Sequence, residues 1–226
     1  MAELKVIAKI HTDFPTKFGI PRQSGMMTGL ISEIVFEPEY RCDEALRGIE
    51  GFSHLWLIWN FSEAERDEWS PTVRPPRLGG NKRMGVFATR SPYRPNPIGL
   101  SSVKFEGLKK TKNGTVILIS GADLMDGTPI YDIKPYLAFT DSHPEAIGGF
   151  ADKEFGYKLE VEFPDVLLEK IDDEKRKGLL NLLSQDPRPS YIEDAERVYG
   201  FTFAEWEIKF TVADGILTVQ DVQNIK

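Results

Sequence analysis

The residues best suited to chemistry lie together in one stretch, Met84 to Leu100, whose centre reads TRSPYRPNPIG. The prolines in this stretch fix backbone angles, so the side chains between them are held at little further cost in conformational entropy. Those side chains are Arg90, Tyr93, Arg94 and Asn96. A rigid backbone with exposed guanidinium, amide and aromatic groups is typical of a binding site. The alternative is a structural proline-rich loop at a barrel rim, which explains the prolines but not the polar residues.

The same part of the chain carries a strong local charge. The whole chain has 28 basic and 35 acidic residues, for a net charge of −7. Between Trp69 and Phe105 there are seven Lys or Arg residues and no Asp or Glu, so the remainder carries −14. Such a distribution favours a polyanion that docks at one place and is repelled elsewhere. The alternative is that acidic neighbours balance this window in space.

Two further segments combine a fixed turn with polar side chains. Lys17 to Gln23 reads KFGIPRQ, so that Arg22 and Gln23 follow a proline. Asp126 to Pro129 reads DGTP, a turn signature just before a predicted strand. Asp-Gly turns are common in structural loops, so the DGTP segment indicates a function only together with the other segments.

Other functional classes lack their motifs. The nearest approach to a phosphate-binding loop, Gly80 to Gly85, is followed by Val86 where a lysine is required. We find no glycine-rich dinucleotide fingerprint and no Ser or Cys nucleophile in a recognisable setting. Cys42 is the only cysteine and the three histidines are scattered, so we expect no disulfide and no metal site. Kinase, NTPase, dehydrogenase and hydrolase functions are therefore disfavoured.

The elements that position these residues are predicted to be short strands in the first two thirds of the chain. Gly and Pro punctuate segments rich in β-branched and aromatic residues, and the spaces between them are mostly too short for crossover helices. We expect a mainly β chain with a small β-barrel over residues 1–143, and one helix near Asp43–Leu46. The predicted strands are Lys5–Ile10, Met27–Phe36, Phe52–Phe61, Met84–Thr89, Leu100–Phe105, Thr115–Ser120 and Ile130–Ile133.

A smaller α+β domain is predicted over residues 152–226, after a loop near His143 to Ala151. Leucines and isoleucines at helical spacing predict a helix over Pro164–Leu183, although Gly178 weakens it by about 1 kcal/mol. Alternation predicts strands at Trp206–Val212 and Ile216–Val222. Such a small domain is expected to lean on the barrel or on a second copy of the chain. No targeting pattern or apolar run of about 20 residues is found, so we expect a cytoplasmic protein with no membrane partner.

Several ordered motifs then point to one family. They are KFGIPRQ, GFSHLW, PTVRPPRLGGNKRMGVFATRSPYRPNPIGLS, DGTPIYDIKPY and DPRPSY. From about Lys5 to its C-terminus the chain resembles the TsaA-like family that includes TrmO, the S-adenosylmethionine-dependent tRNA N6-methyltransferases. The resemblance implies a β-barrel that binds S-adenosylmethionine without a Rossmann sheet, a C-terminal domain, a homodimer and a tRNA substrate.

The resemblance also implies which residues contact the methyl donor. In one region relatives can carry His-Gln where this chain has Ser62-Glu63, which puts the side-chain role there in doubt. The implied donor contacts are Pro21, Arg22, Gln23, Ser62, Glu63, Arg90, Leu100, Asp126, Gly127, Thr128 and Pro129.

The implied substrate is threonylcarbamoyladenosine beside the anticodon of a threonine tRNA. Its N6 belongs to a urea-like group and must lose a proton at or before methyl transfer, so the protein must align donor and acceptor and let that proton leave. Tyr131 and Asp132 are the candidates for the base, and the catalytic residue stays unassigned between them. No metal is required, since a sulfonium donor is already activated.

For the RNA we expect basic, amide and aromatic side chains to meet phosphates, bases or the threonyl carboxylate. The segment DPRPSY repeats the style of the central stretch, although it could equally be a structural connector. The candidates are Arg74, Arg77, Tyr93, Arg94, Asn96, Arg188 and Tyr191. Two rival functions stay open: a methyltransferase for another RNA or a small amine, and a non-catalytic S-adenosylmethionine sensor.

Overall fold

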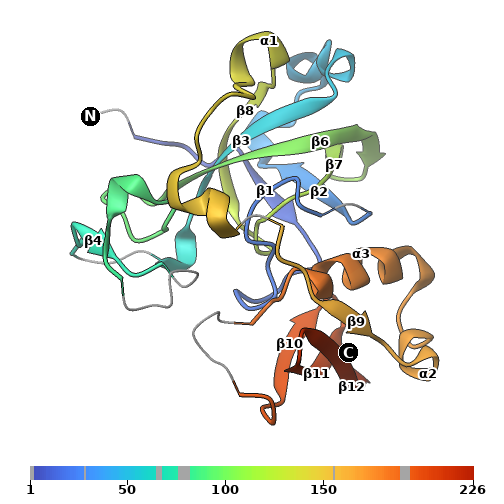
Figure 1. Cartoon of the computed structure of the whole chain (residues 1–226). Helices are drawn as coiled ribbons and strands as arrows, with labels where there is room; N and C mark the ends of the chain where they lie inside the picture. Colours follow the sequence, from blue (N-terminus) through green and yellow to red (C-terminus); the bar gives the residue numbers. More distant parts are fainter. Residues whose placement is uncertain (1–2, 28, 65–67, 76–81, 155, 189–193) are drawn as a thin grey trace.

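The computed structural model describes residues 3–27, 29–64, 68–75, 82–154, 156–188 and 194–226. Strands dominate the regular structure of this part of the chain, so the prediction of a mainly β protein is confirmed. Figure 1 shows a curved sheet from the first part of the chain above a second sheet from the C-terminal part.

The first sheet is a closed barrel with strand order β1-β2-β7-β6-β3-β8, in which β8 also pairs with β1. Every pairing in it is antiparallel. Its strands are β1 (Ala8–His11), β2 (Ile31–Phe36), β3 (His54–Asn60), β6 (Ile98–Thr111), β7 (Gly114–Ser120) and β8 (Pro129–Pro135).

Alternation of side chains along the strands separates the barrel interior from its outer face. On β3, Leu55, Leu57 and Trp59 are buried while the residues between them are partly exposed. Gly99 on β6 lies under Trp59, where a β-carbon would come within 2.2 Å of the indole ring. The glycine is therefore needed for the indole to fill this end of the barrel.

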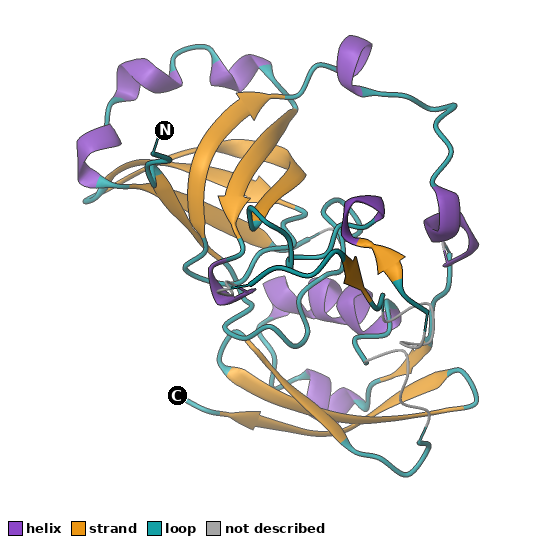
Figure 2. Ribbon diagram, turned by 90° about the vertical axis from the view of Figure 1, so that its left-hand side faces the viewer, coloured by secondary structure: helices purple, strands orange, loops and turns teal. Residues whose placement is uncertain are grey.

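The second sheet has the order β10-β11-β12-β9, with β9 parallel to β12. In both views helix α3 lies between this sheet and the barrel (Figure 1 and Figure 2). The elements here are β9 (Glu160–Glu162), α2 (Asp165–Leu168), α3 (Asp173–Ser184), β10 (Tyr199–Phe203), β11 (Trp206–Ala213) and β12 (Ile216–Asn224).

The remaining elements are short. Strands β4 (Thr72–Val73) and β5 (Met84–Gly85) form a separate two-stranded sheet, and α1 (Ala138–Asp141) follows β8. The 3₁₀ helices are Pro38–Tyr40, Asp43–Leu46, Ile49–Gly51, Ser62–Ala64, Val86–Ala88 and Gly149–Glu154. None of the helices in the described residues is long and apolar enough to cross a membrane.

The C-terminal core is completed by a segment from the other end of the chain. We call residues 12–27 and 29–30, which join β1 to β2, the β1–β2 segment. Its Phe14, Met27 and Leu30 are buried in one cluster with the apolar residues of α3, β10, β11 and β12. In addition, Asp13 forms an ion pair with Lys175, and its carbonyl oxygen accepts a hydrogen bond from the backbone N–H of Ala204 at 2.7 Å. The small C-terminal part thus leans on the barrel's own loop.

Several predictions about elements need correction. The strand predicted over Met27–Phe36 begins only at Ile31, and the one predicted over Leu100–Phe105 runs from Ile98 to Thr111. The strand predicted over Met84–Thr89 is a strand only at Met84–Gly85, because the chain turns into a 3₁₀ helix at Val86. The helix predicted over Pro164–Leu183 is two helices, since the chain breaks between Leu168 and Asp173. Strands β4, β9 and β10 were not predicted: β4 and β9 have only two and three residues, and the alternation of β10 was missed.

Gly178 provides a test of the contact between α3 and the β1–β2 segment. A β-carbon at this position would lie 2.4 Å from Cγ and Cδ2 of Leu30. Helix propensity alone predicts that Gly178→Ala stabilises by about 1 kcal/mol, but overpacking costs about 1–3 kcal/mol. We expect the substitution to lower the free energy of unfolding, measured by urea denaturation. The exposed Lys177→Ala on the same helix is the control, with a change within about 0.5 kcal/mol. A more stable Gly178→Ala variant would contradict the packing.

Candidate functional site

Two cavities meet between the barrel rim and the loops beside it. The smaller, of about 760 Å³, lies among the β1–β2 segment, the end of β3 and the outer face of β6. The larger, of about 1820 Å³, extends toward β4, β5 and the loop before β10. One wall belongs to both, so two ligands bound in the two cavities would be neighbours. The shared lining residues are Lys17, Arg22, Gln23, Ala64, Thr89, Arg90, Pro92, Tyr93 and Arg94.

The shared wall is held rigid by its own hydrogen bonds as well as by prolines. The Arg94 guanidinium donates to the carbonyl oxygens of Thr89 and Ser91, at 3.1 and 3.4 Å. The Thr89 hydroxyl donates to the carbonyl oxygen of Val86 at 2.9 Å. Arg90 reaches away from the loop and donates to the side-chain oxygen of Gln23. The wall is thereby joined to the β1–β2 segment.

Arg22 connects that segment to the C-terminal part of the chain. Its guanidinium donates to the carbonyl oxygens of Asp186 and Arg188, at 3.0 and 2.7 Å. Asp186 and Arg188 themselves form a buried ion pair with two hydrogen bonds of 2.9 Å, and their side chains are only 11% and 14% exposed. This pair and its hydrogen bonds raise the pKa of Arg188 above its ordinary value. Arg188, predicted to bind RNA, therefore has its charge neutralised inside the fold.

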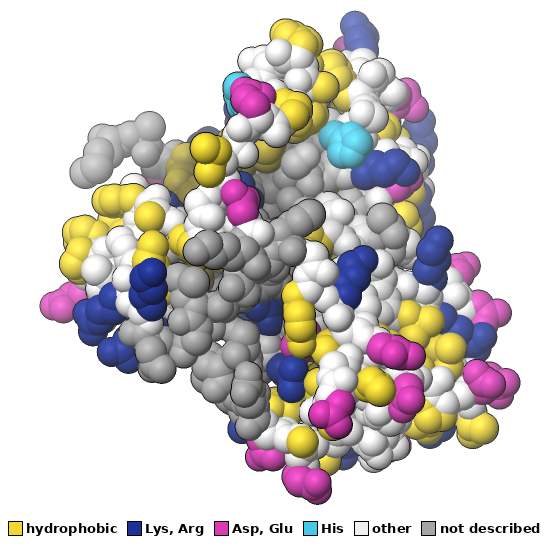
Figure 3. All heavy atoms as spheres, in the orientation of Figure 1, with side chains coloured by type: hydrophobic (Ala, Val, Ile, Leu, Met, Phe, Trp, Pro, Cys, Tyr) yellow, Lys and Arg dark blue, Asp and Glu magenta, His cyan; other side chains and the backbone are white. Residues whose placement is uncertain are grey.

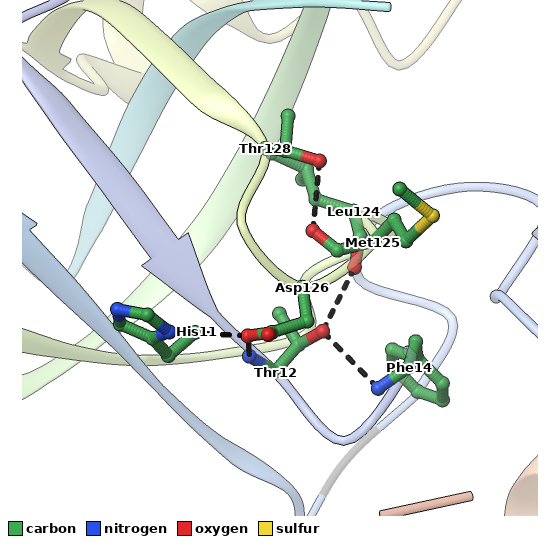
Figure 4. Close-up of polar contacts among 7 residues, drawn as sticks. All are labelled: His11, Thr12, Phe14, Leu124, Met125, Asp126 and Thr128. Carbon is green, nitrogen blue, oxygen red and sulfur yellow. Dashed lines mark hydrogen bonds and ion pairs between the residues drawn. The ribbon is translucent and has the colours of Figure 1, made fainter. Parts of the chain in front are cut away.

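The DGTP turn, Asp126 to Pro129, contacts the start of the β1–β2 segment. The Asp126 carboxylate accepts a hydrogen bond from the backbone N–H of Thr12 at 3.0 Å and lies 3.2 Å from Nδ1 of His11 (Figure 4). The Thr128 hydroxyl donates to the Met125 carbonyl oxygen at 2.7 Å. Asp126 therefore fixes the start of the β1–β2 segment, while Thr128 lines the smaller cavity.

A carboxylate lies deep in the smaller cavity. Asp123 accepts a hydrogen bond of 2.6 Å from the Ser101 hydroxyl, which in turn accepts one of 3.0 Å from the Trp59 indole N–H. Burial raises the pKa of Asp123, while the hydrogen bond from Ser101 and the positive charge of Arg90 oppose the rise. In Glu106 and Asp141, by contrast, hydrogen bonds outweigh burial and lower the pKa.

Most of the residues predicted to contact the donor are brought together. Asp126, Gly127 and Pro129 are not among the residues that line the smaller cavity, and the Asp126 side chain is turned toward His11. The Glu63 carboxylate lies 3.6 Å from the Lys17 ammonium, so this departure from the family pattern links two loops at the cavity mouth. Those that line the cavity are Pro21, Arg22, Gln23, Ser62, Glu63, Arg90, Leu100 and Thr128.

The residues predicted to bind RNA fall into three groups. Arg74, Tyr93, Arg94 and Arg188 line the larger cavity, while Asn96 lines the smaller one. Arg77 and Tyr191 lie outside the described residues.

The two candidates for the base lie on β8. Neither Tyr131 nor Asp132 is among the residues that line the two cavities. Asp132 forms an ion pair of 2.7 Å with Lys134 on the same strand. Both residues stay predictions. Among the described residues no cluster of three or more His, Cys, Asp or Glu side chains could hold a metal ion.

Reasoning from sequence missed Asp123, Ser101 and Trp59. The only signal for Asp123 was an acid three residues before the DGTP turn. Ser101 and Trp59 come from strands distant in sequence, and only the pairing of β3 with β6 brings them together.

The charge predicted from the sequence is visible on the surface. In Figure 3, Lys and Arg side chains gather beside hydrophobic ones at the left, over the region of β4. Seven Lys or Arg residues and one acidic residue, Glu68, line the larger cavity, and two of the seven, Lys17 and Arg188, are paired with Glu63 and Asp186. The described part of this cavity is therefore suited to a polyanion.

Comparison with known proteins gives matches along nearly the whole chain. The family model described as tRNA-methyltransferase O N-terminal domain matches residues 9–142, and the TrmO C-terminal domain model matches residues 156–225. The chain is 41% identical over 216 residues to the tRNA (adenine(37)-N6)-methyltransferase of Escherichia coli K12, covering 93% of this chain and 91% of that protein. Identity to the protein of the same name from Eikenella corrodens is 43% over 176 residues, or 77% of this chain and 99% of that one.

A solved structure agrees with these matches. The crystal structure of TrmO from Pseudomonas aeruginosa superposes with a TM-score of 0.80 at 30% identity, over 99% of this chain and 97% of that one. Two further relatives carry names that describe them as dependent on, or binding, S-adenosylmethionine.

The raised pKa of Asp123 predicts how stability depends on pH. The Asp123 carboxyl has a higher pKa in the folded protein than in the unfolded chain, where its ordinary value is 3.8. Its contribution to the free energy of unfolding is therefore lost as pH rises from about 3.8 through the raised pKa. Asp123→Asn does not ionise and keeps an oxygen that can accept the Ser101 hydrogen bond. We expect this variant to gain stability relative to the native protein as pH rises from about 3.5 toward neutrality.

Urea denaturation across this pH range measures the effect. Asp214→Asn, in the exposed turn between β11 and β12, is the control for loss of a carboxylate at the surface. A stability difference for Asp123→Asn that is constant with pH, or that falls as pH rises, would show that burial does not dominate at this site.

Proposed function

This chain belongs to the tRNA-methyltransferase O family, and we propose that its two cavities divide the reaction between a methyl donor and a tRNA. The enzyme is a tRNA methyltransferase that acts on N6 of the adenosine at position 37, with S-adenosylmethionine as donor. The donor supplies a methyl group already activated on a sulfonium sulfur. The protein's part is to bind, orient and exclude water.

The smaller cavity suits the donor in size and chemistry. Its volume of about 760 Å³ lies within the range of about 300–1,000 Å³ that is usual for small-molecule sites. Trp59, Phe61 and Leu100 offer apolar surface to an adenine ring, while Arg90 and Gln23 can hold a carboxylate. The Asp123 carboxyl group also lines this cavity, where it can accept a hydrogen bond from the donor.

The observation that carries the proposal is the wall shared by the two cavities. Transfer of a methyl group requires donor and acceptor to be nearly in line and in contact. A donor on one side of the wall from Thr89 to Arg94 and an RNA on the other side would meet at its edge. The hydrogen bonds that hold Arg94 to its own loop keep this edge fixed.

We further propose that the acceptor is threonylcarbamoyladenosine in a threonine tRNA. Its threonyl carboxylate adds a negative charge that the cationic lining of the larger cavity would neutralise. The N6 proton leaves to solvent or to a base that this substrate brings within reach. Tyr131 and Asp132 stay candidates for that base, and full activity of Asp132→Asn would remove Asp132.

The proposed assembly is a cytoplasmic homodimer of chains with two domains, residues 1–143 and 152–226. Apolar side chains on the outer face of β6 support the dimer, since Ile98 and Leu100 are 38% and 58% exposed. Ile58 pairs with Leu100 on the neighbouring strand. A second copy that covered this strip would also narrow the donor cavity, because Ile98 and Leu100 line it.

Nucleoside analysis tests the substrate directly. We expect purified protein, incubated with S-adenosylmethionine and total cellular tRNA, to produce methylated threonylcarbamoyladenosine, detected by mass spectrometry. A methylated product in another RNA or on a small amine would show that this RNA or amine, and not threonylcarbamoyladenosine, is the substrate. Tight donor binding with no methylated product would favour a sensor.

Arg90→Ala tests the donor assignment of the smaller cavity. The substitution removes a charged hydrogen-bond donor, an interaction worth about 1.5–3 kcal/mol. We expect the affinity for S-adenosylhomocysteine to fall by about tenfold to 100-fold in titration calorimetry. Arg47→Ala is the matched control, because Arg47 pairs with Glu44 and lines neither cavity. Equal affinities of the two variants would place the donor elsewhere.

A further inference from the structure

Two large aromatic side chains face solvent beside the β4–β5 sheet. Trp69 precedes β4 and Phe87 follows β5, and they are 52% and 73% exposed. Their ring centroids are 6.2 Å apart with an interplanar angle of 29°. Aromatic rings are ordinarily buried, so an exposed stacked pair indicates a contact with another molecule.

The pair lies in the larger cavity rather than on an isolated part of the surface. Both rings line that cavity, as do Arg74 and Arg83 from the ends of the same two strands. Tyr93, on the wall shared with the donor cavity, adds a third exposed aromatic ring at 40% exposure. The groove therefore runs from the aromatic pair to the place where the donor would bind.

The charge of the lining decides between an RNA and a protein as the occupant. Protein interfaces are also rich in aromatic residues and in arginine, but a groove whose charges are almost all of one sign favours a polyanion. Here seven Lys or Arg side chains, of which Lys17 and Arg188 are paired with Glu63 and Asp186, share the described lining with the aromatic rings and one acidic side chain, Glu68. Cationic grooves with interleaved aromatic rings are typical of proteins that bind single-stranded nucleic acid.

We propose that Trp69 and Phe87 form a stacking platform for an unpaired base of the tRNA anticodon loop, next to the adenosine that is methylated. This inference rests on the proposed function. Bases in loops are unstacked from a helix and are recognised mainly by stacking on aromatic rings. The platform would fix the loop while Arg74 and Arg83 meet its phosphates.

Four substitutions in the full-length protein test the platform. Trp69→Ala and Phe87→Ala remove a ring, whereas Trp69→Phe and Phe87→Tyr keep one. Total cellular tRNA and a hairpin with the anticodon-loop sequence serve as probes. We expect each alanine variant to weaken binding of both probes by about fivefold to 150-fold, the range for loss of one stacked base. The aromatic variants should retain most of the affinity, and KM for tRNA should rise more than kcat falls.

Phe139→Ala is the matched control, since Phe139 on α1 is 88% exposed and lines neither cavity. Affinity for S-adenosylhomocysteine should be unchanged in all five variants. Alanine variants that bind tRNA as tightly as the native protein would overturn the platform. So would a loss of dimers at unchanged RNA affinity, which would assign the rings to a contact between chains. Failure of the native protein to methylate tRNA would instead count against the proposed function.

Discussion

The structure depends on the contact between the β1–β2 segment and the C-terminal part of the chain. Phe14, Met27 and Leu30 complete a core that the small C-terminal sheet and α3 share. Arg22, a few residues away, uses its guanidinium to bind the carbonyl oxygens of Asp186 and Arg188. Buried carbonyl groups need such partners, because an unsatisfied one costs about 1–3 kcal/mol. The packing and the hydrogen bonds together hold the segment against both the barrel and the C-terminal part.

The donor cavity follows from this contact. Arg22 and Gln23 line it, and Gln23 accepts a hydrogen bond from Arg90 of the neighbouring loop. Asp126 anchors the other end of the segment by binding the Thr12 amide. A long loop held at both ends thus places polar groups over the barrel rim. The same arrangement separates charge: the cationic groove opens beside the donor cavity, and the excess of acidic residues lies in the rest of the chain.

Part of this site could be predicted from the sequence, for physical reasons. The Arg90–Asn96 wall was predictable because prolines fix its backbone locally, and the DGTP turn because its conformation depends on adjacent residues. The partners of the Arg188 and Asp126 side chains were not predictable, since Arg188 pairs with Asp186 and Asp126 lies beside His11. Asp123 becomes significant only through Ser101, which strand pairing sets beside Trp59. Tertiary contacts, rather than local pattern, decide these roles.

Hydrogen–deuterium exchange on the full-length protein tests the central claim that the C-terminal part holds in place the β1–β2 segment that lines the donor cavity. S-adenosylhomocysteine is added, and exchange is followed at the amides of Gln23, Asp186 and Arg188. Because Arg22 links these sites, the account predicts that all three amides exchange more slowly when the ligand is bound. Slower exchange at Gln23 with no change at Asp186 and Arg188 would contradict it.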